Sequence, residues 1–121
     1  MGRLIQRIAT IVLLVEDTRQ ESLLRRFLQR LGHDNRNMRV NRASKNRGSG
    51  EQYVREQYAS EVRALRRRLA RTRSMLIACI DADIIDVRER LDQFARALRD
   101  AEEAERRDDE PVLNLVAKTK H

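Results

Sequence analysis

Four acidic residues in two clusters are the side chains of this chain best suited to chemistry. Glu16 and Asp17 directly follow one apolar run, and Asp81 and Asp83 follow another. In an extended segment residues i and i+2 point to the same side, so Asp81 and Asp83 can present two carboxylates to one hard cation, typically Mg²⁺. Glu16 would add a third oxygen ligand or a proton-transfer group if the two runs are neighbouring strands. The alternative is that Asp83 merely caps the following helix.

The apolar runs that precede these acids are typical of strands buried on both faces. Ile8–Val15 is continuous and rich in β-branched residues, and Met75–Ile80 is equally apolar. Such strands belong to parallel sheets, whose carboxyl ends carry functional sites. The sequence therefore predicts that both acidic clusters lie at one edge of a sheet.

The rest of the chain alternates between helical and strand patterns. Apolar spacing predicts helices at about Thr18–Leu31, Glu51–Arg71 and from Ile84 or Ile85 to Glu105, and strands at Asn37–Arg42 and Val112–Ala117. This order predicts an α/β fold, a single small three-layer domain with a mostly parallel four-stranded sheet. We expect residues 1–121 to form this one domain, truncated after its last strand.

Two predicted helices carry apolar residues that we expect to face the core. In the first helix these are Leu23, Leu24, Phe27, Leu28 and Leu31, and in the third they are Val87, Leu91, Phe94 and Leu98. Gly32 would end the first helix, and Ser49 with Gln52 has the spacing of a helix cap. Asp17 is an alternative to Thr18 as the cap of the first helix.

The chain is strongly basic, with a net charge of +7 and 37% charged residues. This balance favours a polyanionic partner, most often nucleic acid, although an arginine bias can also come from genome composition. The candidate phosphate contacts are Arg42, Lys45 and Arg47 before the Gly48–Gly50 loop, and Arg66, Arg67 and Arg68 in the second helix. The alternative for that helix is a solvated face on which glutamates pair with nearby arginines.

Cys79 is the only cysteine and lies within an apolar run, so we expect it to pack in the core rather than act as a nucleophile. No disulfide can form within one chain, which fits a reducing compartment and predicts a cytoplasmic protein. Ile8–Val15 is too short to span a bilayer, so we expect no membrane partner.

The order of the motifs resembles the TOPRIM domain. The matching features are Leu13-Leu14-Val15-Glu16, a helix ending at Gly32, a glycine-containing loop and Ile80-Asp81-Ala82-Asp83, over roughly residues 8–116. TOPRIM domains are four-stranded α/β units shared by topoisomerases, bacterial primases, small recombination and repair proteins, and OLD-family nucleases.

This resemblance implies a metal-dependent nuclease, a hydrolase that performs Mg²⁺-dependent phosphodiester chemistry on nucleic acid, with DNA favoured over RNA. It assigns Glu16 as the catalytic acid/base or a metal ligand, and Asp81 and Asp83 as Mg²⁺ ligands. It also implies work within a larger DNA repair or phage-defence assembly, with a protein partner such as an ATPase. The chain departs from the family at Asp17, because a glycine commonly follows the family's glutamate.

The start of the chain also resembles the receiver domain of response regulators. Glu16 and Asp17 would form the acidic pair, Asp81 would accept the phosphoryl group, and Lys118 would be the late lysine. That resemblance ends at Gly32, because the chain between the two acidic clusters is too long for one strand and one short helix. A third interpretation is a non-catalytic basic module that binds nucleic acid through its arginine-rich helix.

Overall fold

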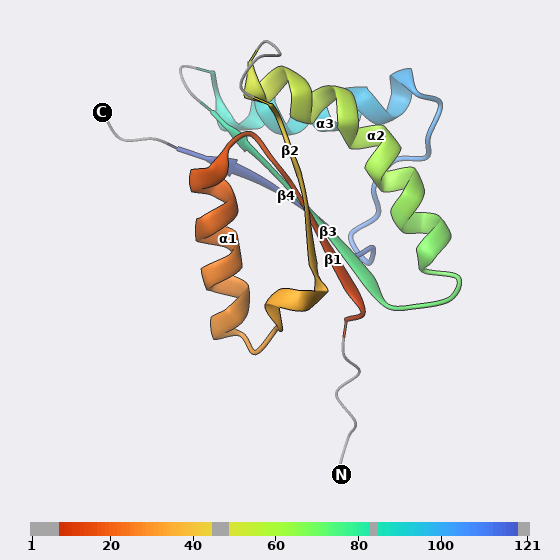
Figure 1. Cartoon of the computed structure of the whole chain (residues 1–121). Coiled ribbons are helices and arrows are strands. Elements are labelled where there is room, and N and C mark those ends of the chain that lie inside the picture. Colours follow the sequence, from red (N-terminus) through yellow and green to blue (C-terminus); the bar gives the residue numbers. More distant parts are fainter. Residues whose placement is uncertain (1–7, 45–48, 83–84, 119–121) are drawn as a thin grey trace.

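A computed structural model of the chain describes residues 8–44, 49–82 and 85–118 (Figure 1). Helices and strands alternate along it. They are β1 (Thr10–Val15), α1 (Thr18–Arg30), the short 3₁₀ helix η1 (Asn35–Asn37), β2 (Met38–Arg42), α2 (Gly50–Arg68), β3 (Ser74–Asp81), α3 (Val87–Asp100) and β4 (Val112–Ala117). The predicted alternation is confirmed, and the last strand has the predicted bounds.

The four strands form one sheet in the order β2-β1-β3-β4, and every neighbouring pair is parallel. The α/β prediction is therefore confirmed, with a sheet that is wholly parallel across its described strands. The inner strands β1 and β3 pair with each other, with Leu14 opposite Ala78. Their carboxyl ends lie at the same edge of the sheet, and Glu16 and Asp81 stand there.

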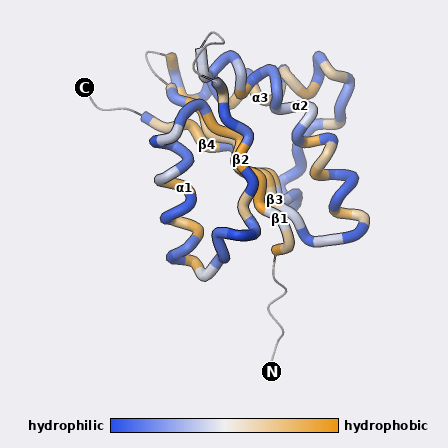
Figure 2. The backbone as a smooth tube through the Cα atoms, viewed as in Figure 1, coloured by the Kyte–Doolittle hydropathy of each residue, from blue (hydrophilic) through white to orange (hydrophobic). Residues whose placement is uncertain are grey.

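Helices cover both faces of the sheet, α1 on one side and α2 with α3 on the other (Figure 1). Side chains of a strand point alternately to the two faces. Val12 and Leu14 of β1 pack with α2 and α3, whereas Leu13 and Val15 pack with α1. Hydrophobic residues accordingly concentrate in the strands at the centre of the molecule (Figure 2).

The layer of α2 and α3 is well buried. Tyr58 of α2 and Phe94 of α3 are at most 1% exposed, and their ring centroids lie 4.6 Å apart. Val54, Val62 and Leu65 complete the buried stripe of α2. The two amphipathic helices, side by side, thus bury the strand residues on this face of the sheet.

The α1 layer differs from the prediction. Leu24 and Leu28 are buried, but Leu23, Phe27 and Leu31 are 66%, 55% and 61% exposed. The expectation that all five residues face the core is wrong for these three. The physical reason is that α1 is the only described helix on its face, so only the side that touches the sheet is covered.

Helix α3 is also shorter than predicted, and its buried side differs. Asp86 caps α3 by accepting a hydrogen bond from the Arg88 N–H, and Asp83, the predicted alternative cap, lies outside the described residues. Leu91 is 41% exposed, whereas Arg90 is only 4% exposed. The predicted stripe is therefore confirmed at Phe94 and Leu98 and wrong at Leu91.

The remaining helix ends follow ordinary capping chemistry. The Asp17 carboxylate accepts a hydrogen bond from the Gln20 N–H at 2.9 Å and so caps α1, and Ser49 caps α2 as predicted. Gly32 follows α1 with φ +98°, a left-handed conformation that favours glycine. None of the helices within the described ranges is long and apolar enough to cross a bilayer.

Candidate functional site

The carboxyl ends of β1 and β3 are joined through Glu16. This residue directly follows β1, and its carboxylate accepts a hydrogen bond from the backbone N–H of Asp81, the last residue of β3. The Glu16 N–H donates in turn to the Gln20 side chain at 2.8 Å. The Glu16 side chain is therefore fixed at the edge of the sheet, beside the Asp81 backbone, with further carboxylate lone pairs left to accept other ligands.

Helix α2 begins directly against Glu16. A Cβ atom on Gly50 would lie 2.7 Å from the Glu16 Cβ and 3.1 Å from its carbonyl oxygen. Only glycine permits this approach, so the glycine serves the packing of α2 on the site. Lys45 and Arg47, predicted to contact phosphate, lie outside the described residues. The structure therefore assigns a packing role to the end of the Gly48–Gly50 loop.

A buried arginine of α3 holds the end of β3 and the start of α2 together. The Arg90 guanidinium donates to the carbonyl oxygen of Asp81 at 3.1 Å, to the Glu51 carboxylate at 2.9 Å and to the Gln93 side chain at 3.0 Å. It thus ties α3 to the end of β3 and to the first turn of α2. Sequence reasoning missed Arg90, although its spacing of four residues from Phe94 places both on one side of α3.

The surroundings of Glu16 change its acidity. Burial, as the main cause, raises the pKa of the Glu16 carboxyl, and the nearby Asp81 charge raises it further, while the hydrogen bond from the Asp81 N–H partly opposes both. A carboxyl group with a raised pKa holds its proton closer to neutral pH. Such a group is suited to give and take protons in catalysis.

Cys79 lies in β3 close to these acids but is not a candidate nucleophile. Burial raises the pKa of its thiol to about 12, and the charges of Glu16 and Asp17 add to this effect. A thiol with so high a pKa is not ionised near neutral pH, and the thiolate is the nucleophilic form. Cys79 packs in the α1 layer, as predicted.

The predicted metal ligands fall into two groups. Glu16 and Asp81 are brought together, whereas Asp83 lies outside the described residues. Within the described ranges, no three His, Cys, Asp or Glu side chains are placed to hold one metal ion. Mg²⁺ is commonly bound by one or two carboxylates together with water and substrate phosphates, so the residue types fit this ion, although the contact between Glu16 and Asp81 runs through the Asp81 backbone N–H.

A groove opens beside these acids on the α1 side of the sheet. We call it the α1 groove. Its volume is about 700 Å³, and it is lined by the first turns of α1 and the ends of β3 and β4. Its charged residues are Asp17, Arg19, Arg26, Asp81 and Lys118. The groove therefore presents acids and bases together at the carboxyl edge of the sheet.

Of the arginines predicted to contact nucleic acid, Arg42 lies at this same carboxyl edge, opposite Val15 in the sheet, whereas the cluster of α2 lies elsewhere. Arg42 forms an ion pair with Glu21. Arg66 pairs with Glu110 at 2.8 Å and with Glu103 at 3.3 Å, and its side chain is 22% exposed. Because a helix rises 1.5 Å per residue, Arg66 lies about 24 Å along α2 from its first residue, which touches the site. Arg67, which is exposed, and Arg68, which is half-buried, lie at the same far end.

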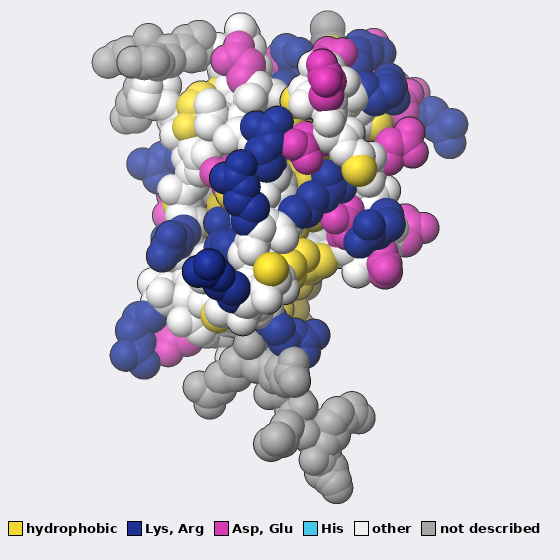
Figure 3. All heavy atoms as spheres, turned by 90° about the vertical axis from the view of Figure 1, so that its right-hand side faces the viewer, with side chains coloured by type: hydrophobic (Ala, Val, Ile, Leu, Met, Phe, Trp, Pro, Cys, Tyr) yellow, Lys and Arg dark blue, Asp and Glu magenta, His cyan; other side chains and the backbone are white. Residues whose placement is uncertain are grey.

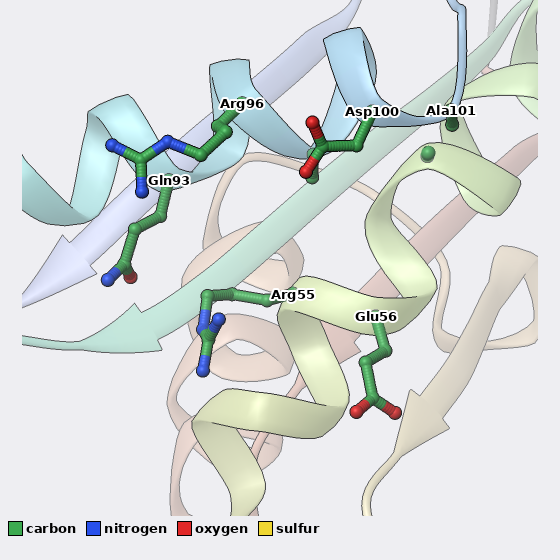
Figure 4. Close-up of a pocket in the computed structure, with 8 residues that line it drawn as sticks. Arg55, Glu56, Gln93, Arg96, Asp100 and Ala101 are labelled. Carbon is green, nitrogen blue, oxygen red and sulfur yellow. The ribbon is translucent and has the colours of Figure 1, made fainter.

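A second hollow, of about 320 Å³, lies between α2 and α3. Figure 4 shows that α2 contributes Arg55 and Glu56, and that α3 contributes Gln93, Arg96 and Asp100. Arg55 is already paired with Glu51 at 2.6 Å. Basic and acidic side chains also lie intermingled over the face seen in Figure 3, so this side offers no concentrated charge.

The sequence prediction did not include Arg19 and Arg26, the arginines of the α1 groove. The spacing of charged residues along the helix could have identified Arg26. Arg25 has Glu21 four residues before it and forms an ion pair with it at 2.9 Å. Arg26 has Ser22 and Arg30 at the corresponding positions, so no acid on its own helix can pair with it at that spacing. Arginines without such a partner are the better candidates for binding an external anion.

Comparison of the chain with protein-family models, with curated proteins and with solved structures found no match.

Proposed function

We propose that this protein performs Mg²⁺-dependent phosphodiester chemistry on nucleic acid, in the manner of a TOPRIM-like nuclease. One observation carries the proposal. The Glu16 carboxylate and Asp81 meet at the carboxyl edge of a parallel sheet, beside a groove that also holds arginine side chains. Carboxylates for a hard cation and arginines for phosphates are the two kinds of group that this chemistry requires.

Each residue has a distinct role in the proposal. Asp81, together with Asp83 two residues further along the sequence, would hold the ion, which when bound neutralises charge on the phosphodiester. Glu16 would serve either as a further ligand of the ion or, because burial raises its pKa, as the group that exchanges a proton with the attacking or leaving oxygen. Arg90 keeps the end of β3 in place, so it acts on the reaction through Asp81.

The test is cleavage of labelled single- and double-stranded DNA and RNA, with Mg²⁺ and with EDTA. We expect cleavage only with Mg²⁺, and its loss in Glu16→Gln and Asp81→Asn. Asp108→Asn is the matched control, because this acid is fully exposed and lies before β4, at the other edge of the sheet. Cleavage that survives in Asp81→Asn, or no cleavage under any of these conditions, contradicts the proposal.

One observation favours a second candidate, a receiver-type domain that accepts a phosphoryl group. Asp17, Asp81 and Lys118 line the same groove, which matches the acidic and lysine residues that the receiver resemblance implies. Incubation with acetyl phosphate followed by intact mass spectrometry tests it. A phosphoryl adduct that Asp81→Asn abolishes supports this candidate, and an unchanged mass rejects it.

A further inference from the structure

We propose that the α1 groove binds a short segment of single-stranded nucleic acid, with its phosphates held by Arg19, Arg26 and Lys118. The inference rests on the proposed function, because it names the substrate class of that site and the path that the strand takes. It also moves the phosphate contacts from the arginine cluster of α2 to the opposite side of the sheet.

The cations of the groove are available for an external anion. Arg19, Arg26 and Lys118 are exposed, and none of them forms an ion pair with a residue in the described ranges. Arg19 and Arg26 are seven residues apart, two turns of one helix, so they lie on the same side of α1 about 10 Å apart along its axis. This separation suits two different phosphates of one strand.

The arrangement of charges in the groove also determines where the phosphates of the nucleic-acid strand lie relative to the acids. Asp17 and Asp81 line the same groove and repel a phosphate placed directly on them. A phosphate would therefore lie on an arginine, and Asp81 would help to hold a cation that supplies positive charge beside it. This division matches the proposed chemistry, in which the ion meets one phosphodiester and the arginines hold its neighbours.

The size of the groove selects the form of the nucleic acid. A volume of about 700 Å³ lies within the range of sites for small ligands, so it holds a few nucleotides of a flexible strand. Leu23 provides apolar surface, since its side chain is 66% exposed at the groove. The described residues that line the groove include no aromatic side chain, so we expect phosphate contacts rather than base stacking to dominate binding.

The experiment measures binding of fluorescein-labelled oligothymidylate by fluorescence anisotropy, in EDTA so that no cleavage occurs. We expect Arg19→Ala and Arg26→Ala each to weaken binding about tenfold. For three phosphate contacts to a single strand, the logarithm of the affinity should fall with the logarithm of salt concentration with a slope of about −2. Arg30→Ala is the matched control on the same helix, because Arg30 is exposed but does not line the groove.

Four results would overturn the inference. They are equal loss in Arg30→Ala, loss in Arg67→Ala without loss in the α1 variants, no binding at low salt, and displacement of the oligonucleotide by polyglutamate as efficient as by unlabelled oligothymidylate. The last result would assign the groove to an acidic protein segment. Failures of the two proposals are distinguishable because binding is measured without metal. If only the proposed function fails, the oligonucleotide binds and Arg19→Ala weakens this binding, but no cleavage occurs. If only the inference fails, cleavage occurs with Mg²⁺ but Arg19→Ala and Arg26→Ala bind the oligonucleotide as well as the unchanged protein does.

Discussion

Two pairs of arginines on opposite faces of the sheet differ in their partners. On the face of α2 and α3, Arg63 and Arg66 pair with Glu103 and Glu110, which come from the connection between α3 and β4. On the α1 face, Arg19 and Arg26 form no ion pair with a described residue. The first set fastens the connection to α2, whereas the second leaves its charge for a ligand.

The apolar residues of the two layers differ in the same way. Each layer contains one of the two phenylalanines of the chain, and Phe94 of α3 is 1% exposed whereas Phe27 of α1 is 55% exposed. The α2 and α3 layer therefore supplies most of the packing, and the α1 layer carries surface that packing does not use. We infer that stability and binding are concentrated on opposite faces of one small sheet.

The largest expected effect is the difference in stability between variants of the phenylalanine in each layer. Phe94→Ala should lower the free energy of unfolding by about 3–5 kcal/mol, because it leaves a cavity against Tyr58. The matched change Phe27→Ala should alter it by no more than about 0.5 kcal/mol. Urea unfolding followed by circular dichroism measures both, and similar losses in the two variants would contradict the comparison.

The ion pairs of the α2 face predict a loss of stability in acid. The Arg66 side chain lowers the pKa of the Glu110 carboxyl from 4.5 to about 2. Since the folded state holds this group ionised, its contribution is present above pH 4.5 and disappears as the pH falls toward 2. It amounts to about 3 kcal/mol.

The variant Glu110→Gln should remove this part of the pH dependence and lower stability at neutral pH. Unfolding experiments between pH 2 and 7 provide the measurement. Asp108→Asn is the control, because the Asp108 carboxylate is fully exposed. An unaltered acid profile in Glu110→Gln would show that Arg66 does not hold the connection through an ion pair with Glu110.

A medium effect is expected where α2 meets the site. Gly50→Ala forces a Cβ atom against Glu16, so we expect a loss of about 1–3 kcal/mol together with reduced activity. Gly32→Ala is the matched control: its φ of +98° costs strain of about 1 kcal/mol, but no atom lies within 4 Å of the added Cβ. Reduced activity in the Gly32 variant at a temperature where both are folded would refute the local explanation.

The smallest effect concerns the protonation of Glu16. Because its folded pKa is raised, Glu16 favours the folded state most below its unfolded pKa, and this contribution is lost as the pH rises through the folded pKa. Glu16→Gln should therefore be slightly more stable than the natural protein at neutral pH, with the difference shrinking in acid. Thermal unfolding of both proteins from acid to neutral pH tests this prediction. A lower stability of Glu16→Gln at neutral pH contradicts it.

Much of the fold was predictable because its signals are local. Continuous apolar runs indicated the strands, and Gly32 and Ser49 marked helix ends by their conformation and capping chemistry. The burial of α1 was not predictable in this way. Helical spacing identifies an apolar side of a helix but not how many neighbouring elements cover it, and within the described ranges no other α-helix packs on the α1 face (Figure 1).

The candidate site was predictable only in part, for the same reason. The ends of two buried strands pointed to Glu16 and Asp81, because parallel strands bring their carboxyl ends together. The pairing of Arg66 with Glu110 depends on a contact between residues 44 positions apart, which no local pattern reveals. Composition indicated a polyanion as partner but could not tell arginines engaged within the protein from arginines left exposed.

The most direct test of the central claim is to localise a bound divalent ion by nuclear magnetic resonance, with Mn²⁺ as a paramagnetic substitute for Mg²⁺. We predict that Mn²⁺ broadens the amide signals of Glu16, Asp17, Asp81 and Ala82, that Mg²⁺ competes for the site, and that Asp81→Asn abolishes the effect. No broadening at these residues, or broadening confined to the exposed acids before β4, would contradict the proposed metal site.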